Sequence, residues 1–162
     1  MTESRPLVAA EHMVDVFDRA STMNFTTIVA VRGPLDDDAL DAALRAVERR
    51  HPLLRARIAR KGGLRFVMGE GEKIALRVLD ATKEEVNGYA EATLAHRVWP
   101  DAGPRAELVH LRHALGHSTL LFTMHHVVGD GSSGVIVVRD ILRALAGTLP
   151  DGVVPSPGQN AF

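Results

Sequence analysis

Hydrophobic and polar residues follow one another along this chain in patterns that predict strands. Residues 25–31, Phe-Thr-Thr-Ile-Val-Ala-Val, are β-branched and apolar, and Gly33-Pro34 ends the strand that they predict. Further strands are expected over residues 53–59, 64–68, 74–79, 106–112 and 119–126. The first two of these form a predicted hairpin that turns at Lys61-Gly62-Gly63, and the last two pair around Gly116.

Apolar residues at helical spacing predict three helices between these strands. The first opens at Asp36-Asp37-Asp38, where one aspartate can cap the helix while the others favour its positive end, and it stops at Pro52. The second follows the capping-box pair Thr82 and Glu85 and ends before Pro100. The third covers residues 132–146, although residues 135–138 alone would suit a strand. Because helices alternate with strands and several strands join through hairpins, the pattern predicts an α/β fold in which helices cover a mixed sheet.

Composition places the chain among ordinary globular domains and narrows its partners. Its 162 residues are 46% hydrophobic and 24% charged, and no apolar run reaches bilayer-spanning length. With no secretion signal and no cysteine, we expect a cytoplasmic protein without disulfides. A net charge of −1 and 4% aromatic residues argue against nucleic acid as a partner. One domain is expected over residues 1–149, and the Pro- and Gly-rich residues 150–162 are expected to form an interlobe linker or tail.

The candidate functional residues cluster in one stretch at the end of an apolar strand, His125-His126-Val127-Val128-Gly129-Asp130-Gly131. Adjacent strand residues point to opposite faces, so His125 and His126 cannot easily share a metal ion, and no third ligand stands at a recognisable spacing. Residues 129–134 satisfy the dinucleotide pattern G-x-G-x-x-G, but the following strand with an acidic end is missing. A strand end with satisfied core histidines and no activity remains an alternative.

General-base catalysis is the interpretation that uses the whole cluster. His126 shares a strand face with Leu120, Phe122 and Met124, so it should emerge from an apolar wall at the end of the strand. An imidazole there can take a proton from an alcohol or an amine near neutral pH. Gly131, which lacks a Cβ, would let a substrate approach that imidazole closely.

This stretch resembles the H-H-x-x-x-D-G signature of condensation domains and related CoA- or carrier-dependent acyltransferases. Two other stretches agree with the resemblance. Residues 50–55 are similar to the family's R-H-x-x-L-R segment, and residues 104–108 and 120–124 resemble the strand pair that delivers the motif. Glu11 near the start, and R-H-P in place of R-H-E, are most similar to the polyketide-associated acyltransferases. The resemblance implies a chloramphenicol-acetyltransferase-like two-layer sandwich.

The resemblance also implies a role for each residue of the motif. His126 is expected to be the catalytic base, while His125, Asp130 and Gly131 are expected to be structural. Arg55 is the expected ion-pair partner of Asp130, with Arg57 as the second choice. No metal and no covalently bound cofactor are implied.

The implied reaction moves an acyl group from a thioester to an alcohol or amine in lipid, polyketide or nonribosomal peptide biosynthesis. The donor would be acyl-CoA or a phosphopantetheinyl carrier protein. Enzymes of the family have two similar lobes, so we expect a C-terminal lobe, in the same protein or a separate chain, or self-association. The chain should then expose apolar surface around Phe122, Met124 and His126. The alternative is a non-catalytic scaffold lobe that docks a carrier protein or a sister lobe.

Overall fold

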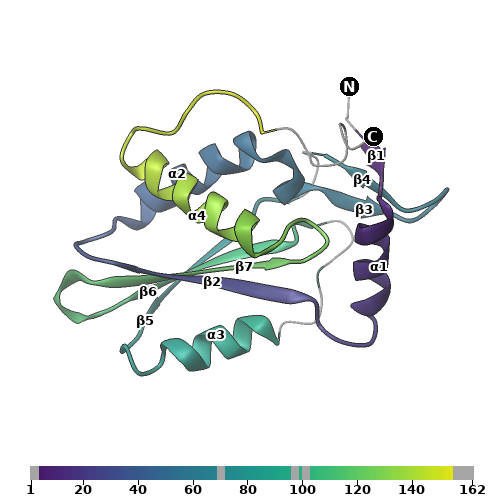
Figure 1. Cartoon of the computed structure of the whole chain (residues 1–162). Helices are drawn as coiled ribbons and strands as arrows, with labels where there is room; N and C mark the ends of the chain where they lie inside the picture. Colours follow the sequence, from purple (N-terminus) through teal and green to yellow (C-terminus); the bar gives the residue numbers. More distant parts are fainter. Residues whose placement is uncertain (1–3, 69–71, 96–98, 100–102, 155–162) are drawn as a thin grey trace.

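The computed structural model describes residues 4–68, 72–95, 99 and 103–154, and its centre is a four-stranded mixed sheet (Figure 1). The strand order is β2-β7-β6-β5, with antiparallel pairing between β2 and β7 and between β7 and β6. β5 lies parallel to β6, so the predicted mixed sheet is confirmed. The bounds are β2 Asn24–Val31, β5 Ala75–Asp80, β6 Ala106–Arg112 and β7 Ser118–His125.

A second, smaller sheet lies at the end of the molecule where β7 ends. It is antiparallel in the order β1-β4-β3, with β1 at Ser4–Pro6, β4 at Arg65–Val67 and β3 at Arg57–Ala59. The predicted hairpin is confirmed, and Gly62 and Gly63 turn it with positive φ values of 81° and 104°. The prediction of a strand from residue 53 is wrong, because a short 3₁₀-helix occupies Pro52–Arg55.

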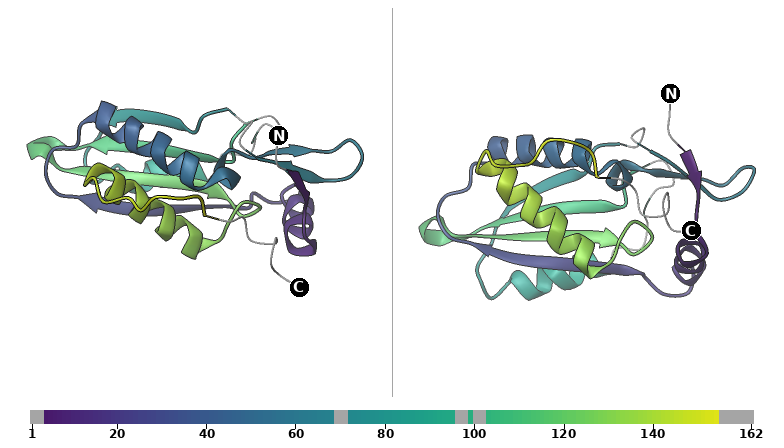
Figure 2. Two further views of the ribbon diagram at one scale, coloured as in Figure 1. Left: turned by 90° about the horizontal axis from the view of Figure 1, so that it is seen from above. Right: turned by 45° about the horizontal axis from the view of Figure 1, so that its top comes forward.

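Three long helical segments follow the sequence prediction closely. α2 at Asp37–Arg50 and α4 at Gly131–Leu145 cover one face of the large sheet, whereas α3 at Val86–Leu94 covers the opposite face (Figures 1 and 2). Asp36 caps α2 by accepting a hydrogen bond of 2.8 Å from the Ala39 N–H. In the described parts of the chain, no helix combines the length and the apolar composition needed to cross a lipid bilayer.

An N-terminal helix, α1 at Ala9–Phe17, was not predicted from the pattern. Polar contacts hold it to the small sheet. The Glu11 carboxylate accepts two hydrogen bonds from Arg5, at 2.6 and 2.7 Å, and one from the Val8 N–H at 2.8 Å. Asp15, which is buried, accepts two more from Arg60. Two ion pairs therefore stabilise this helix, one with Arg5 six residues before Glu11 and one with the distant Arg60, and a pattern of hydrophobic residues reports neither.

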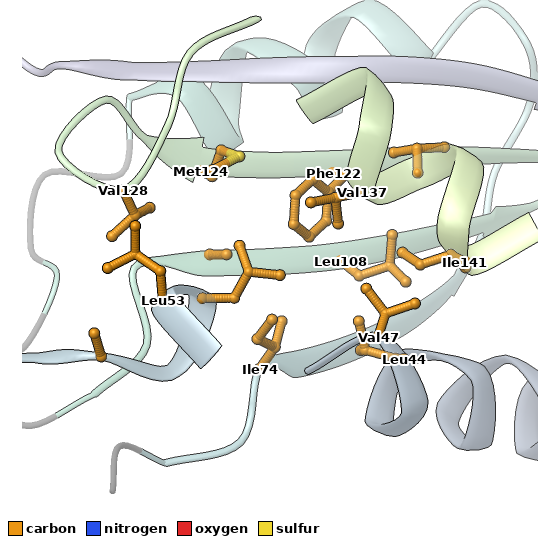
Figure 3. Packing of buried hydrophobic residues seen from close by; sticks show 14 of the residues in the cluster. Leu44, Val47, Leu53, Ile74, Leu108, Phe122, Met124, Val128, Val137 and Ile141 are labelled. Carbon is orange, nitrogen blue, oxygen red and sulfur yellow. The ribbon is translucent and has the colours of Figure 1, made fainter. Parts of the chain in front are cut away.

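The main core lies between the large sheet and the pair of helices α2 and α4. Figure 3 shows Phe122 of β7 beside Val137 of α4, and Leu108 of β6 beside Ile141 of α4, within one buried cluster. Side chains that alternate with these on β6 and β7, namely Val109, Leu111 and Leu121, form a second cluster with Ala90 of α3. Both faces of β7 are therefore covered, and all eight of its residues are buried. This is why polar, exposed residues do not alternate with apolar ones along residues 118–125.

Candidate active site

The histidine motif lies in the tight turn that joins the end of β7 to the start of α4. Backbone hydrogen bonds hold this turn from two sides. The His125 N–H donates to the Arg105 carbonyl at 3.0 Å, and the His126 N–H donates to the Met23 carbonyl at 2.8 Å. The Val128 N–H closes the turn by donating to the His125 carbonyl at 3.1 Å. The position of both histidines is thus determined by the backbone.

His125 is buried, with 1% of its surface exposed, and it organises the turn from inside. Its Nδ1 accepts a hydrogen bond of 3.0 Å from the Val127 N–H. Its Nε2 lies 3.0 Å from Asp18 Oδ1, an ion-pair distance whose angle falls outside hydrogen-bond geometry. Burial lowers the pKa of His125 by more than the Asp18 carboxylate raises it. Because Nδ1 accepts the Val127 N–H, a neutral ring carries its proton on Nε2, the nitrogen that faces Asp18.

His126 is exposed, and its ring packs against Phe25 of β2 with 4.7 Å between the ring centroids. Leu120, Phe122 and Met124, by contrast, are all 0% exposed in the main core. The predicted apolar surface around Phe122 and Met124 is therefore wrong. β7 ends at His125, so the alternation of faces stops one residue before His126, and α4 with α2 covers the apolar face.

Asp130 forms the N-cap of α4. Its Oδ1 accepts hydrogen bonds of 2.8 Å from both the N–H and the Oγ of Ser133. These bonds hold the pKa of Asp130 below its usual value, with a smaller contribution from the nearby His126. Among the described residues no ion pair joins Asp130 to Arg55 or Arg57, so Ser133 takes the place of the predicted arginine partner. Arg55 lies half-buried in the 3₁₀-helix that follows α2.

The glycines of the motif serve two different purposes. A Cβ built on Gly131 would meet nothing within 4 Å, so the space in front of this residue is open. A Cβ on Gly129 would lie 2.8 Å from Met124 Cε, and one on Gly134 would lie 2.5 Å from Thr27 Oγ1. Gly129 and Gly134 therefore permit close packing of the turn and of α4 against the sheet, a role that the sequence analysis missed.

A buried charge cluster fixes α4 from the other side. Asp140 of α4 is 1% exposed, and its Oδ2 lies 2.9 Å from His51 Nε2 and 3.1 Å from Arg50 Nε. Burial raises the pKa of Asp140, but hydrogen bonds from His51 and Arg50 outweigh it, so the pKa lies below its usual value. The R-H pair of the predicted R-H-x-x-L-R segment thus anchors the helix whose first turn carries Asp130 and Gly131.

The structure thus brings His125, His126, Asp130 and Gly131 into one turn. Sequence reasoning missed Asp18 and Phe25, which contact the two histidines from α1's C-terminal end and from β2. Neither residue carries a local signal, since the contacts exist only after β2 has paired with β7. Within the described residues, no group of three or more His, Asp or Glu side chains is arranged to hold a metal ion.

Comparison with known protein sequences agrees with this geometry. The condensation-domain family model matches residues 13–157. The beauvericin nonribosomal cyclodepsipeptide synthetase of Beauveria bassiana is 34% identical over 128 residues, covering 75% of this chain and 4% of that synthetase. The uncharacterized protein Rv2305 of Mycobacterium tuberculosis is 31% identical over 168 residues, covering 99% of this chain and 38% of that protein. The chain therefore spans well under half the length of these relatives.

Solved structures of the same fold include two from biosynthetic synthases. The starter condensation domain of the rhizomide synthetase RzmA superposes with a TM-score of 0.81 at 20% identity, covering 94% of this chain and 39% of that one. The condensation domain of the monacolin K polyketide synthase MokA gives 0.80 at 21% identity, covering 94% and 36%. The predicted fold class is confirmed by these matches. With the family model spanning most of its length, the chain belongs to the condensation-domain family.

Proposed function

We propose that this chain is the N-terminal lobe of an acyltransferase in which His126 is the general base. The observation that carries the proposal is the contrast between the two histidines. His125 is buried, with Nδ1 bonded to the Val127 N–H and Nε2 3.0 Å from Asp18, while His126 is exposed in the same turn as Gly131, where the space is open. The accessible imidazole is the one that can meet a substrate.

The reaction follows from this position. His126 takes the proton of the acceptor hydroxyl or amine, and the acceptor oxygen or nitrogen attacks the thioester carbonyl carbon. The carbon–sulfur bond then breaks, the thiolate leaves, and the imidazolium returns the proton to the sulfur. Because burial lowers the pKa of His125, that ring stays neutral and adds no second positive charge beside the base. The product is an ester or an amide.

The donor is proposed to be an acyl thioester of CoA or of a phosphopantetheinyl carrier protein, in the cytoplasm. Two relatives support this class of donor. One matched structure of the rhizomide synthetase domain is a complex with C8-CoA, and the beauvericin relative is a nonribosomal synthetase. Lipid, polyketide or nonribosomal peptide biosynthesis is the corresponding setting.

A second lobe is part of the proposal, because this chain covers only 36% to 39% of the two condensation domains compared above. It would be a C-terminal lobe or a second copy of this chain. Residues 1–149 would form the first lobe and 150–162 the connection that follows it. The start of that connection is held in place, since Arg50 Nη1 donates to the carbonyls of Pro150, Asp151 and Gly152. Residues 155–162 lie outside the described residues.

The test is acyl transfer by the assembly that contains both lobes. His126→Ala should lower single-turnover transfer from an acyl-CoA or carrier thioester by about 10²–10⁴-fold, the usual contribution of a general base. His12→Ala, which removes an exposed histidine from α1, is the matched control and should transfer at the parent rate. A folded His126→Ala protein with parental turnover would exclude His126 as the base.

One observation favours the second candidate, a non-catalytic docking lobe. α1 exposes three apolar side chains, Met13, Val16 and Phe17, each at 50% to 55%. A docking lobe would bind its partner equally well with or without His126, and no transfer would be seen even with the second lobe present. Comparing binding and transfer for the His126→Ala variant therefore separates the two candidates.

A further inference from the structure

A hollow of about 760 Å³ opens on the α3 face of the large sheet, at the end opposite to His126. We call it the distal hollow. Its walls come from β2, from the loop and first turn that begin α3, and from the turn before β7. β7 runs from Ser118 beside the hollow to His125 in the motif, which separates them by roughly 23 Å at about 3.3 Å per residue. The distal hollow and the histidine turn share no residue.

The hollow exists because α3 is shorter than the strands beneath it. Nine helical residues span only about 13 Å, whereas β7 spans about 23 Å from Ser118 to His125. The C-terminal end of α3 is fixed near the start of β2, where Asn24 Nδ2 donates to the Leu94 carbonyl at 3.3 Å. Figure 1 shows that α3 leaves the far end of the strands uncovered, beyond its first turn. The residues that line the hollow lie at this end of the sheet.

The lining of the distal hollow is basic. Arg32, Lys83 and His117 all face it, and none of the three forms a hydrogen bond or ion pair through its side chain with another described residue. No aspartate or glutamate is among the residues that line it. Nearby Arg112 differs, because Asp80 and Asp37 pair with it at 2.9 and 3.3 Å. These three basic side chains therefore line the distal hollow, and none of its lining residues is acidic.

Acidic residues do line an adjoining hollow of about 800 Å³, which shares Lys83, His113 and His117 with the distal hollow. These acidic residues are Asp80, Glu84 and Glu85. The Glu85 carboxylate accepts a hydrogen bond of 2.7 Å from the Thr82 N–H, and Asp80 pairs with Arg112. Glu84 lines the adjoining hollow but not the distal hollow. The N-terminal end of α3 reaches the distal hollow through Val86 and Asn87, and its N-cap residue is Glu85.

The remaining lining combines the apolar residues Ile28, Ala30, Val31 and Val86 with the polar residues Asn87, Ser118 and Thr119. Ile28 of β2 is 49% exposed, a large fraction for an isoleucine in a strand, and Val86 of α3 stands across from it. His113 stiffens the base, because its Nδ1 lies 2.7 Å from the Ala81 carbonyl and its Nε2 lies 2.8 Å from Thr119 Oγ1. A ligand here would meet positive charge and an exposed aliphatic surface together.

We propose that the distal hollow binds a small anionic amphiphile, a carboxylate or phosphate attached to a short apolar chain. The anionic head satisfies Arg32, Lys83 and His117, and the chain covers Ile28 and Val86. The volume lies within the range typical of small-molecule sites. This site is independent of the acyl-transfer proposal, since it lies at the other end of β7.

The experiment is calorimetric titration of the full chain with octanoate, with octyl phosphate and with uncharged octanol. Lys83→Gln and Arg32→Gln should each weaken binding of the anions about fivefold, the value of one charge pair at about 4 Å in water. Added salt should weaken it too. Ile28→Ser should weaken binding through loss of apolar contact. Lys61→Gln, in the exposed hairpin turn, is the matched control and should bind like the parent.

The ratio of the two anion affinities identifies the preferred head group. Thermal unfolding of each variant checks that these exposed substitutions leave the fold intact. The proposal is overturned if no saturable binding occurs, if octanol binds as well as the anions, or if the Arg32→Gln and Lys83→Gln double variant binds like the parent.

Discussion

Asp140→Asn is the substitution that most directly tests how α4, which follows the histidine turn, is held in place. The change removes the negative charge from a side chain that is 1% exposed and keeps its size. Breaking a buried ion pair by removing one partner costs about 3–5 kcal/mol, because the other charge is left uncompensated. Here Arg50 keeps three carbonyl acceptors after the change, so we expect the low end of that range, about 3 kcal/mol.

Urea unfolding and thermal unfolding measure this effect. About 3 kcal/mol corresponds to a fall in Tm of about 6–12 °C for a chain of this size, with an unchanged denaturant slope if compactness is preserved. The pH dependence adds a second signature. Since the pKa of Asp140 is lowered in the folded protein, its stabilisation is present above the unfolded pKa of about 3.9 and is lost as the pH falls through the folded value. The Asp140→Asn variant should not show this loss of stability at low pH.

Asp41→Asn is the matched control, because Asp41 also pairs with an arginine on the same fold but is half-exposed. It should change stability by less than about 1 kcal/mol. If Asp140→Asn unfolds at the temperature of the parent, the cluster of Asp140, His51 and Arg50 contributes nothing net and the anchoring of α4 must lie elsewhere.

Three further predictions concern the turn itself. Asp130→Ala removes the cap of α4 and should cost about 0.5–2 kcal/mol in thermal unfolding; a stability equal to the parent would show that the cap bonds are replaced by water. Gly134→Ala places a Cβ 2.5 Å from Thr27 Oγ1 and should lower the free energy of unfolding by about 1–3 kcal/mol in urea. Gly131→Ala should leave the free energy of unfolding unchanged and lower turnover. Equal losses of stability at both positions would contradict this. Because burial lowers the pKa of His125, its contribution to stability should be complete above the unfolded pKa of about 6.5 and should fall as the pH drops below it. If the urea midpoints of the parent and of His125→Asn change with pH in the same way, this prediction is refuted.

Local patterns determined most of the elements and all of the motif. The strands β2, β5, β6 and β7 and the helices α2, α3 and α4 were predicted within a few residues, because periodicity, capping residues and prolines act over a single turn or strand. The motif was recognisable for the same reason, since seven consecutive residues carry it. Its resemblance to condensation domains then predicted the family correctly.

Tertiary contacts decided what each motif residue touches. His126 does not lie on the apolar face of β7, because the strand ends one residue earlier, at His125. The His126 N–H donates instead to the Met23 carbonyl. Asp130 binds Ser133 in its own helix, while the charge that anchors α4 is Asp140, whose partners lie at the end of α2. Contacts between residues so distant in sequence cannot be predicted from periodicity, because the spacing of residues in one segment does not indicate which side chain of another segment will contact it. The distal hollow arises in the same way, from a helix that is shorter than the strands it covers.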